Sequence, residues 1–375
     1  DYGFTPIENN FEGAAKVYHT DNSIDRTGQY EMGYKSNGVD LSGKVRSEGH
    51  ITAFGLNYRD DSAYFTGKGS TQGFLPFPLV YNTIPDETIE ILGVFYQDSW
   101  QMNDQLQASY GARWDDYSYT DKDGKKYSDD GFSPNVGFSY AATEEWDLNA
   151  SYGKAFRGVT PIDLITANEG GIENGENIDP EKATNAEFGF QYDNGQFFAN
   201  GTYYKQKVRN VIGSSDGIRE NLGELEVDGW DFAVGLREGN FTSSLGVSDS
   251  DPELNGADLT DDNIGLGTAF GRAWNANAEY RLPEKQIALG WTMILMEGYH
   301  SINPLAEKEG YDIHNFYLQW VTGTASNVVV TLAVNNAFDI TYIDQATSGY
   351  NSQLDRVAGL PERGRDIRLS TSIQF

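Results

Sequence analysis

The sequence predicts an all-β protein, a transmembrane antiparallel up-and-down β-barrel with about 16 strands in this chain. Three observations predict it. Long segments alternate apolar and polar residues, the connections between them alternate in length, and aromatic residues gather near the segment ends. Aromatic residues make up 13% of the 375 residues although mean hydropathy is −0.54. A barrel with a wet lumen reconciles a polar average with a membrane location.

The alternation has a period of two and extends over segments of about ten to fifteen residues. In segment 104–119, the apolar set is Leu106, Ala108, Tyr110, Ala112 and Trp114. Segments 145–157, 272–282 and 367–375 repeat this pattern. Strands of soluble sandwiches usually contain about five or six residues. Strands of ten or more residues fit a tilted crossing of a bilayer.

Tyr and Trp residues near the segment ends predict aromatic girdles at the two membrane surfaces. These residues are Trp100, Tyr140, Trp146, Tyr192, Tyr280, Tyr299, Tyr311 and Trp320. The side chains between the apolar ones would then face a water-filled lumen. The first strands are expected near 11–19, 38–47 and 49–60, and residues 1–375 are expected to form a single barrel domain.

The connections alternate between short and long, as in outer-membrane barrels with tight periplasmic turns and long extracellular loops. The short ones are 101–104, 142–145, 193–195, 238–240, 283–285 and 323–326. The long ones are 61–87, 120–131, 158–181, 209–223, 250–269, 301–310 and 343–364. A soluble two-sheet sandwich does not require short and long connections to alternate in this way.

Composition excludes several classes of protein and site. The chain has 27 basic and 56 acidic residues, a net charge of −29, and no cysteine. This charge has the wrong sign for a duplex nucleic acid partner, and without cysteine there is no disulfide, thiolate metal site or cysteine nucleophile. The sequence contains no 18-residue apolar run that would predict a membrane-spanning helix. No covalent cofactor is expected.

Several motifs, in order along the chain, resemble the barrel of TonB-dependent outer-membrane receptors. They are GVFYQDSW at 93–100, YGARWD at 110–115, FSPNVGF at 132–138, AFRG at 155–158, IDPEK at 178–182, NAFDITY at 336–342, Gly364-Arg365 and the terminal Phe375. Residues 155–158 and 178–182 are similar to the F-R-A-P and L-x-P-E boxes of that family, although Gly158 and Val159 replace Ala-Pro.

The resemblance implies that structural positions of the family fall on particular residues here. These are Phe156, Arg157, Pro180, Glu181, Asn336, Phe338, Asp339, Tyr342 and Phe375. Arg157 is expected to pair with a lumen carboxylate. Pro180 is expected just before a strand, since proline cannot donate to a strand ladder.

The resemblance also implies location, partners and function. The family barrel has 22 strands and an N-terminal plug that contacts an inner-membrane energy-coupling protein, whereas this chain supplies about 16 strands and no plug. The implied location is the bacterial outer membrane, where lipid and lipopolysaccharide are partners. The implied function is energised import of an iron-bearing nutrient, a siderophore or haem-type ligand, without chemistry on the substrate.

The alternation of short and long connections predicts which strand ends lie at the extracellular side. The ligand-binding candidates are polar and aromatic residues at or near this outer rim. They are His19, Tyr117, Tyr119, Arg157, His300 and His314, with His50 at a periplasmic turn. Neutral imidazole binds iron and haem well, but a rim histidine can equally be hydrogen-bonded or solvated. Segment 158–181, where haem receptors of the family often carry a ligating histidine, has none.

Loop 250–269 partly matches a calcium loop. Counted from Asp251, oxygen ligands fall at positions 1, 3, 5 and 12, on Asp251, Glu253, Asn255 and Asp262, with Gly256 at position 6. Glu at position 3 and Asp at position 12 depart from the pattern, Pro252 interrupts it, and no helices flank it. A solvated acidic loop is the alternative interpretation.

Two other functions remain as alternatives. A passive outer-membrane porin would conduct ions without a plug, and the order of the motifs argues against it. A barrel enzyme would need converging Ser, His and acidic side chains, and no nucleophile or zinc-protease motif occurs. The acidic loops should repel anionic catechol siderophores and favour cationic or neutral ligands, so exchanging acidic loop clusters for Asn should weaken uptake in a salt-dependent way.

Overall fold

The computed structural model describes residues 2–4, 10–26, 30–67, 84–159, 173–215, 218–259, 269–300, 307–322, 328–347, 349–351 and 356–374. The chain forms two compact units. Unit 1 comprises residues 1–139, 151–186 and 207–224, and unit 2 comprises 140–150, 187–206 and 225–375. The expectation of a single barrel domain stays a prediction.

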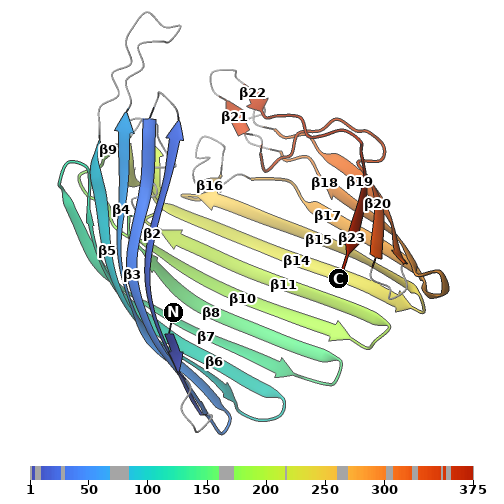
Figure 1. Cartoon of the computed structure of the whole chain (residues 1–375), viewed down its shortest axis with the longest axis horizontal. Coiled ribbons are helices and arrows are strands. Elements are labelled where there is room, and N and C mark those ends of the chain that lie inside the picture. Colours follow the sequence, from blue (N-terminus) through green and yellow to red (C-terminus); the bar gives the residue numbers. More distant parts are fainter. Residues whose placement is uncertain are drawn as a thin grey trace, which may run out of the picture. The chain divides into compact units, whose positions relative to one another are not determined.

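Figure 1 shows that the described part of the chain consists mostly of strands. The longer strands up to the chain's middle are β2 (Phe11–Arg26), β3 (Tyr30–Ser47), β4 (His50–Gly67), β5 (Ile84–Gln101), β6 (Leu106–Thr120), β7 (Lys126–Ala141), β8 (Trp146–Arg157), β10 (Glu181–Asp193) and β11 (Phe197–Arg209). They continue with β14 (Glu224–Glu238), β15 (Phe241–Leu254), β17 (Ala273–Leu282), β18 (Ile287–Met296), β19 (Tyr311–Thr322), β20 (Val328–Asn335) and β23 (Asp366–Ile373).

Short elements lie between or before these strands. They are β1 (Tyr2–Phe4), β9 (Glu173–Asn174), β12 (Ile212–Ser215), β13 (Ile218–Asn221), β16 (Ala257–Asp258), the 3₁₀ turn η2 (Pro283–Lys285), β21 (Gly349–Asn351) and β22 (Arg356–Ala358). Within the described part of the chain, no helix is long and apolar enough to cross a membrane.

The strands are antiparallel neighbours joined in sequence order. In unit 1, β2 pairs with β3, β3 with β4, β4 with β5, and β5 with β6. In unit 2, β14 pairs with β15, followed by β17, β18, β19, β20 and β23. Among the described residues, eighteen strands belong to one sheet and sixteen of those have eight or more residues. The predicted fold class and strand number are therefore confirmed.

The strands extend further than the sequence predicted at the long-loop end. β2, β3 and β4 reach Arg26, Tyr30 and Gly67, and β7 already begins at Lys126. The connection expected over 120–131 is thus only 121–125, because Tyr127 packs against Tyr119 and continues the ladder through an acidic stretch. The region 209–223 contains the hairpin β12–β13 rather than an irregular loop.

Register explains the alternation in unit 1. Ala15, Leu41, Leu56, Val94 and Trp114 form one cross-strand row through β2–β6, the outer row. Leu41 is 47%, Val94 45% and Trp114 38% exposed. An exposed apolar row of this kind is what a lipid-facing surface requires.

The adjacent row through the same strands is polar. It consists of Lys16, Asp40, Asn57, Gly93 and Asp115, the inner row. Successive residues of a strand point to opposite faces of the sheet, so this row faces away from the outer row. The polar side chains thus belong to the lumen face.

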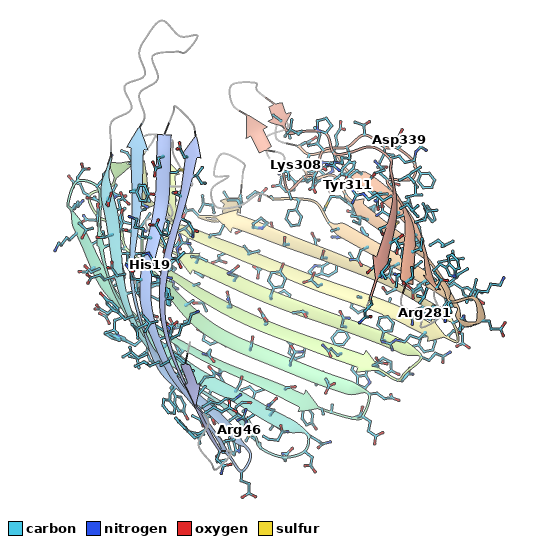
Figure 2. All side chains as sticks on the ribbon, in the orientation of Figure 1. His19, Arg46, Arg281, Lys308, Tyr311 and Asp339 are labelled. Carbon is cyan, nitrogen blue, oxygen red and sulfur yellow. The ribbon has the colours of Figure 1, made fainter. Side chains whose placement is uncertain are left out.

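Unit 2 follows the same rule. Trp291 is opposite Phe316 on the apolar face. On the other face, Asn277 donates to Ser244 Oγ (2.5 Å) and Asn315 donates to Thr292 Oγ1 (3.2 Å). Figure 2 shows Arg281 beside the short-turn end of β17, with Lys308 and Tyr311 toward the long-loop end of the unit.

Buried side chains in unit 1 gather at the long-loop end of the strands. The cluster comprises Ile89, Tyr117, Tyr119, Tyr127, Val159, Ile178 and Ile212. It brings together β5, β6 and β7 with the segments that follow β8 and β11. The packed part of unit 1 therefore lies under its loops, as in a sheet that is wet on one face and lipid-facing on the other.

Candidate functional site

The main candidate site is a cavity of about 560 Å³ on the inner face of unit 1. Seven strands, β2 to β8, and the start of the segment after β8 contribute to it. Its lining residues are Tyr18, Asp40, Asn57, Arg59, Ile89, Ile91, Arg113, Asp115, Tyr117, Ser133, Ala155, Phe156, Arg157 and Gly158. Three guanidinium groups and three aromatic rings thus meet in a space that can take an organic ligand.

Arg113 is held across the sheet by a chain of polar contacts. Its Nε donates to both carboxylate oxygens of Asp115 (2.7 and 2.8 Å), and its Nη1 donates to Asn57 Oδ1 (2.7 Å). Asn57 Nδ2 in turn donates to Asp40 Oδ1 (2.9 Å). The guanidinium lies over Gly93, where an added Cβ would meet Arg113 Nη2 at 2.0 Å. Glycine at position 93 is therefore required for the Arg113 side chain to pass over β5 and reach Asn57.

The other two arginines are also paired with acids. Arg59 Nε lies 2.7 Å from Oδ2 of Asp61, whose side chain is 1% exposed. Arg157 Nε lies 3.3 Å from Glu181 Oε2. These contacts fix the guanidinium positions, and the carboxylates of Asp61, Glu181, Asp115 and Asp40 offset the positive charge of the three arginines.

Aromatic side chains form the wall of the cavity near Arg157. The rings of Phe156 and Tyr117 are 5.8 Å apart, and the Phe156 ring covers Gly131, where a Cβ would come within 2.1 Å of it. Gly158 likewise leaves room for the ring of Tyr117. The glycine that replaces alanine in the first family-like box therefore admits a tyrosine ring.

A buried polar network lies next to this wall, at the long-loop end. Tyr119 donates to Glu87 Oε2, and the Tyr119 oxygen accepts hydrogen bonds from Arg219 Nη2 (2.7 Å) and Asn174 Nδ2 (3.3 Å). Arg219 Nε also donates to Asn174 Oδ1 (2.7 Å) and Nη2 lies 3.8 Å from Glu87 Oε2. The network ties the loop elements β9 and β13 to β5 and β6.

Electrostatics of this network are set by burial. Glu87 lies fourteen positions from Gln101 at the short-turn end of β5, and about ten tilted residues cross a bilayer, so Glu87 lies beyond the membrane-spanning segment. Burial raises the pKa of the Glu87 carboxyl above its usual value, against the lowering effects of Tyr119 and Arg219. Burial also raises the pKa of Tyr119 strongly.

The structure separates the predicted ligand-binding residues. Tyr117 and Arg157 line the inner-face cavity, whereas Tyr119 is fully buried in the network beside it. His19 lies opposite Asn37 and hydrogen-bonds its Oδ1 (2.7 Å). His19 shares a face of β2 with Val17, which is 75% exposed, so it belongs to the outer face. Figure 2 shows it well away from Arg46 at the short-turn end.

The two histidines predicted in unit 2 have separate surroundings. His314 accepts a hydrogen bond from Trp291 Nε1 (3.1 Å), stacks on that indole and meets the Phe338 ring edge-on. It shares the apolar face of β19 with Phe316. His300 is 87% exposed, 3.7 Å from Glu307. Whether either histidine binds a ligand stays a prediction.

The calcium candidates are partly outside the described residues, since Asp262 lies there. Asp251 and Glu253 are in β15, where they pair with Asp228 and Glu226 of β14. Asn255 and Gly256, both with positive φ, make a tight turn into β16. Among the residues that the structure describes, no three His, Asp or Glu side chains are grouped as metal ligands. The calcium interpretation stays a prediction.

The family-like residues at the C-terminal side form a compact turn. Asn336 has a positive φ of 47° and its amide bridges the chain by donating to Ile340 O (2.8 Å) and accepting from Ile340 N (3.0 Å). Asp339, with φ 58°, accepts from the Arg365 backbone N–H (2.8 Å). Tyr342 packs on Tyr311 at 4.5 Å. Phe375 lies outside the described residues, and Pro180 immediately precedes β10.

Sequence reasoning missed most of the cavity. Asp40, Asn57, Arg59 and Arg113 were not among the predicted ligand-binding residues, although Asn57, Arg59 and Asp61 alternate on one strand face. That alternation was a usable signal for a shared polar face. The neighbours across the sheet depend on register, which a single sequence does not give.

The long antiparallel strands carry an apolar outer row and a polar inner row, and a buried network joins their upper ends to the loops. These features define an outer-membrane barrel protein. The family described as TonB dependent receptor-like, beta-barrel matches residues 1–337. The chain therefore belongs to this family of outer-membrane receptors, and the predicted family and location are confirmed.

Individual relatives are similar at low identity. The heme transporter BhuA of Brucella abortus is 19% identical over 300 residues, covering 76% of this chain and 44% of BhuA. The FrpB iron transporter of Neisseria meningitidis matches with a TM-score of 0.79 and 21% identity, covering all of this chain and 62% of FrpB. The copper transporter OprC matches with a TM-score of 0.81 and 15% identity, covering all of this chain and 64% of OprC. The chain thus spans about half the length of the curated relatives.

Proposed function

We propose that this chain forms barrel strands of a receptor that imports an iron-bearing nutrient, a siderophore or haem-type ligand, across the outer membrane. The observation that carries the proposal is the inner-face cavity, in which three guanidiniums converge with aromatic rings. Two similar proteins are named as transporters of heme and of iron. The third is named for copper, so copper belongs in the test.

The cavity chemistry suits a ligand of low net charge that carries one or two carboxylates. Arginine binds carboxylates in a bidentate manner, and the rings of Tyr18, Tyr117 and Phe156 offer apolar faces to a chelate or macrocycle. A polyanionic ligand is disfavoured because the chain has a net charge of −29 and each arginine already has an acidic neighbour. This agrees with the expectation that the acidic loops repel catecholates.

Energy for import would come from outside this chain. Receptors of this family interact with TonB machinery of the inner membrane, and we extend that partner to this protein as part of the proposal. Loops would bind the ligand, a plug would shift, and the lumen would open, leaving the ligand chemically unchanged. The plug would be supplied by sequence beyond the strands described above.

The test is growth of a deletion strain on single iron sources, with the complete gene restored as wild type or as Arg113→Ala. Haem, ferric siderophores of different charge, and a copper-limited medium form the arms. We expect wild type to restore growth on at least one iron source. Arg113→Ala should raise the ligand concentration needed for half-maximal uptake about tenfold, because it removes one charge-assisted contact.

The matched control is Arg281→Ala, which removes a guanidinium from the lumen face of unit 2 where Arg281 is 72% exposed. It should leave uptake unchanged. Uptake that persists without inner-membrane energy coupling would indicate a passive porin, and ion conductance of the protein in planar bilayers would support that alternative. Growth restored only under copper limitation would overturn the iron proposal.

A further inference from the structure

The lipid-facing side of unit 1 carries a carboxylate close to the short-turn end of β5. Asp98 lies three positions before Gln101, the last residue of that strand, and it shares its face of β5 with Tyr96 and with Val94 of the outer row. Tyr96 is exposed, whereas the Asp98 side chain is only 1% exposed. A shielded charge on this side of the sheet requires partners that compensate for its removal from water.

Two side chains of β4 provide these partners. His50 Nδ1 lies 2.8 Å from Asp98 Oδ2, and Thr52 Oγ1 donates to Asp98 Oδ1 at 2.7 Å. Because an ionised carboxylate can only accept, the imidazole donates from Nδ1, and Nε2 of the neutral ring is an acceptor. Among the residues that the structure describes, Nε2 makes no hydrogen bond. The His50 side chain is 34% exposed, so the pair presents an acceptor with a negative charge behind it.

Trp100 adds a donor beside this acceptor. It lies opposite His50 in the register of β4 and β5, and the two rings stack with centroids 5.3 Å apart and planes 11° apart. Trp100 is exposed, and within the described part of the chain its Nε1–H has no hydrogen-bond partner. The adjoining turn holds the stack in place, because Gln101 N donates to Gly49 O at 2.7 Å. An acceptor and a donor thus lie side by side on two rings.

The two rings lie at the level of the inner-leaflet head groups. Short turns of outer-membrane barrels are periplasmic, and His50 is the first residue of β4 after such a turn. At about 3.3 Å per residue and a tilt of about 45°, Asp98 is roughly 7 Å above the end of β5. The apolar face continues above it with Phe54 and Tyr96, which are opposite each other. The polar part of a phospholipid therefore meets the two rings.

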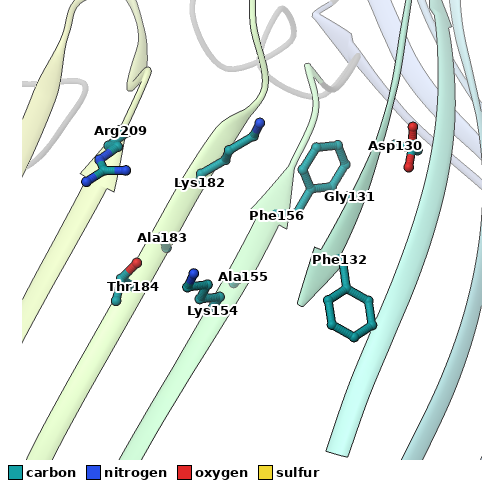
Figure 3. Close-up of a pocket in the computed structure, with 10 residues that line it drawn as sticks. All are labelled: Asp130, Gly131, Phe132, Lys154, Ala155, Phe156, Lys182, Ala183, Thr184 and Arg209. Carbon is teal, nitrogen blue, oxygen red and sulfur yellow. The ribbon is translucent and has the colours of Figure 1, made fainter. Parts of the chain in front are cut away.

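The long-loop end of unit 1 has charges of the opposite sign. Figure 3 shows a second cavity, of about 260 Å³, where Lys154, Lys182 and Arg209 meet at the long-loop ends of β8, β10 and β11. Asp130, which accepts a hydrogen bond from Trp114 of the outer row (3.0 Å), is the one carboxylate among the residues that line this cavity. The short-turn end instead offers an acceptor and a carboxylate, which favour a cationic head group over an anionic one.

We propose that the stacked rings of His50 and Trp100, backed by Asp98, bind the ethanolamine phosphate head group of an inner-leaflet phospholipid. The ammonium would donate to His50 Nε2, with the Asp98 carboxylate stabilising its charge. Trp100 Nε1–H would donate to the phosphate at the other end of the ethylene link. A trimethylated ammonium has no N–H and a glycerol head group has no cation, so phosphatidylcholine and phosphatidylglycerol should bind less well. The proposal depends on the outer-membrane location and not on the transported ligand.

The test is native mass spectrometry of the complete receptor, reconstituted in vesicles of equal parts phosphatidylethanolamine, phosphatidylcholine and phosphatidylglycerol with identical acyl chains and released in mild detergent. In the wild type, retained phosphatidylethanolamine should exceed either competitor about tenfold, because hydrogen bonds to charged groups are the stronger ones. His50→Asn keeps a donor near the position of Nδ1 for Asp98 and removes Nε2, so this preference should disappear. Trp100→Phe keeps a stacked ring and removes Nε1–H, so the preference should fall about threefold.

Trp146→Phe is the matched control, because Trp146 is an exposed aromatic residue at the short-turn end of β8 whose ring lies against Tyr192 and not against a histidine. It should keep the wild-type preference. Equal retention of the three lipids by the wild type, or a preference for phosphatidylglycerol, would overturn the proposal, and so would an unchanged preference in His50→Asn. The heat-dependent gel shift of folded barrels identifies a variant that fails to fold, and the wild type compared with Trp100→Phe then decides.

Discussion

The two neighbouring rows through β2–β6 differ in almost every property although they are built from adjacent residues. The outer row holds Leu41, Leu56 and Val94, which are exposed and apolar, with no polar partner needed. The inner row holds Asp40 and Asn57, linked to each other and to Arg113 by hydrogen bonds. One step along a strand thus changes the solvent from lipid to water.

This difference shows that an exposed side chain in this protein meets lipid on one face of the sheet and water on the other. In the outer row, an exposed apolar side chain is stable because lipid replaces water around it. In the inner row, an exposed ion pair costs little because water solvates it, and it contributes little to stability for the same reason. Substitutions that exchange the two rows' chemistry should therefore have very unequal effects.

The largest effect is expected from Leu41→Arg compared with Ser42→Arg. Leu41 is in the outer row near the middle of the crossing, whereas Ser42 is the next residue on β3 and faces the lumen. The first change should reduce the free energy of unfolding in lipid vesicles by about 2–4 kcal/mol, and the second by well under about 1 kcal/mol. Denaturant titration of the refolded barrel measures both. Similar losses at the two positions would contradict the assignment of the faces.

A smaller effect is expected from Gly93→Ala in the inner row. The new Cβ would displace the Arg113 guanidinium and break its hydrogen bond to Asn57, at a cost of about 1–2 kcal/mol. Gly153→Ala is the matched control, because a Cβ there meets Asn135 Cβ at an ordinary 3.6 Å. The difference between the two unfolding free energies is the measured quantity. No difference would mean that the Arg113–Asn57 contact contributes nothing to stability.

The smallest effect concerns the upper end of the inner face, where the polar groups become buried. The pKa of Glu87 is raised in the folded protein, so its contribution to stability is complete below its unfolded pKa near 4.5 and is lost as pH rises through the higher folded pKa. In wild type, amide exchange protection of β9 and β13 should decrease from pH 4 to pH 7. Glu87→Gln should flatten this dependence.

Glu284→Gln is the control for the pH prediction, because Glu284 lies in the exposed short turn η2. Its exchange profile should follow that of the wild type. If Glu87→Gln retains the full pH dependence, other groups of the network titrate instead and the Glu87 assignment is wrong.

Much of the fold was predictable because a membrane imposes period-two patterning on every strand. The segments beginning near Leu106 and Trp146 were located from alternation alone, and the number of strands agreed with the structure. Strand ends were less predictable. The stretch around Asp129 and Asp130 is acidic, as a loop would be, yet it forms β7 because Tyr127 packs on Tyr119 and water solvates its carboxylates.

The candidate site was predictable only in part. Arg157, which belongs to a family-like box, and Tyr117, which lies near a strand end, were predicted from the sequence, and both line the inner-face cavity. The Arg219–Tyr119 contact joins residues one hundred positions apart, which no local pattern reveals. His314 was placed at the correct end of its strand, but register placed it on the apolar face against Trp291.

The sequence by itself determined the strands, their alternation and the family, because side-chain period and motif order are written along the chain. The tertiary structure decided which residues are neighbours. Register brought Asp40, Asn57 and Arg113 together across four strands. The physical reason is that hydrogen bonds between strands fix the cross-sheet partners, and a shift of one residue would turn every side chain to the opposite face.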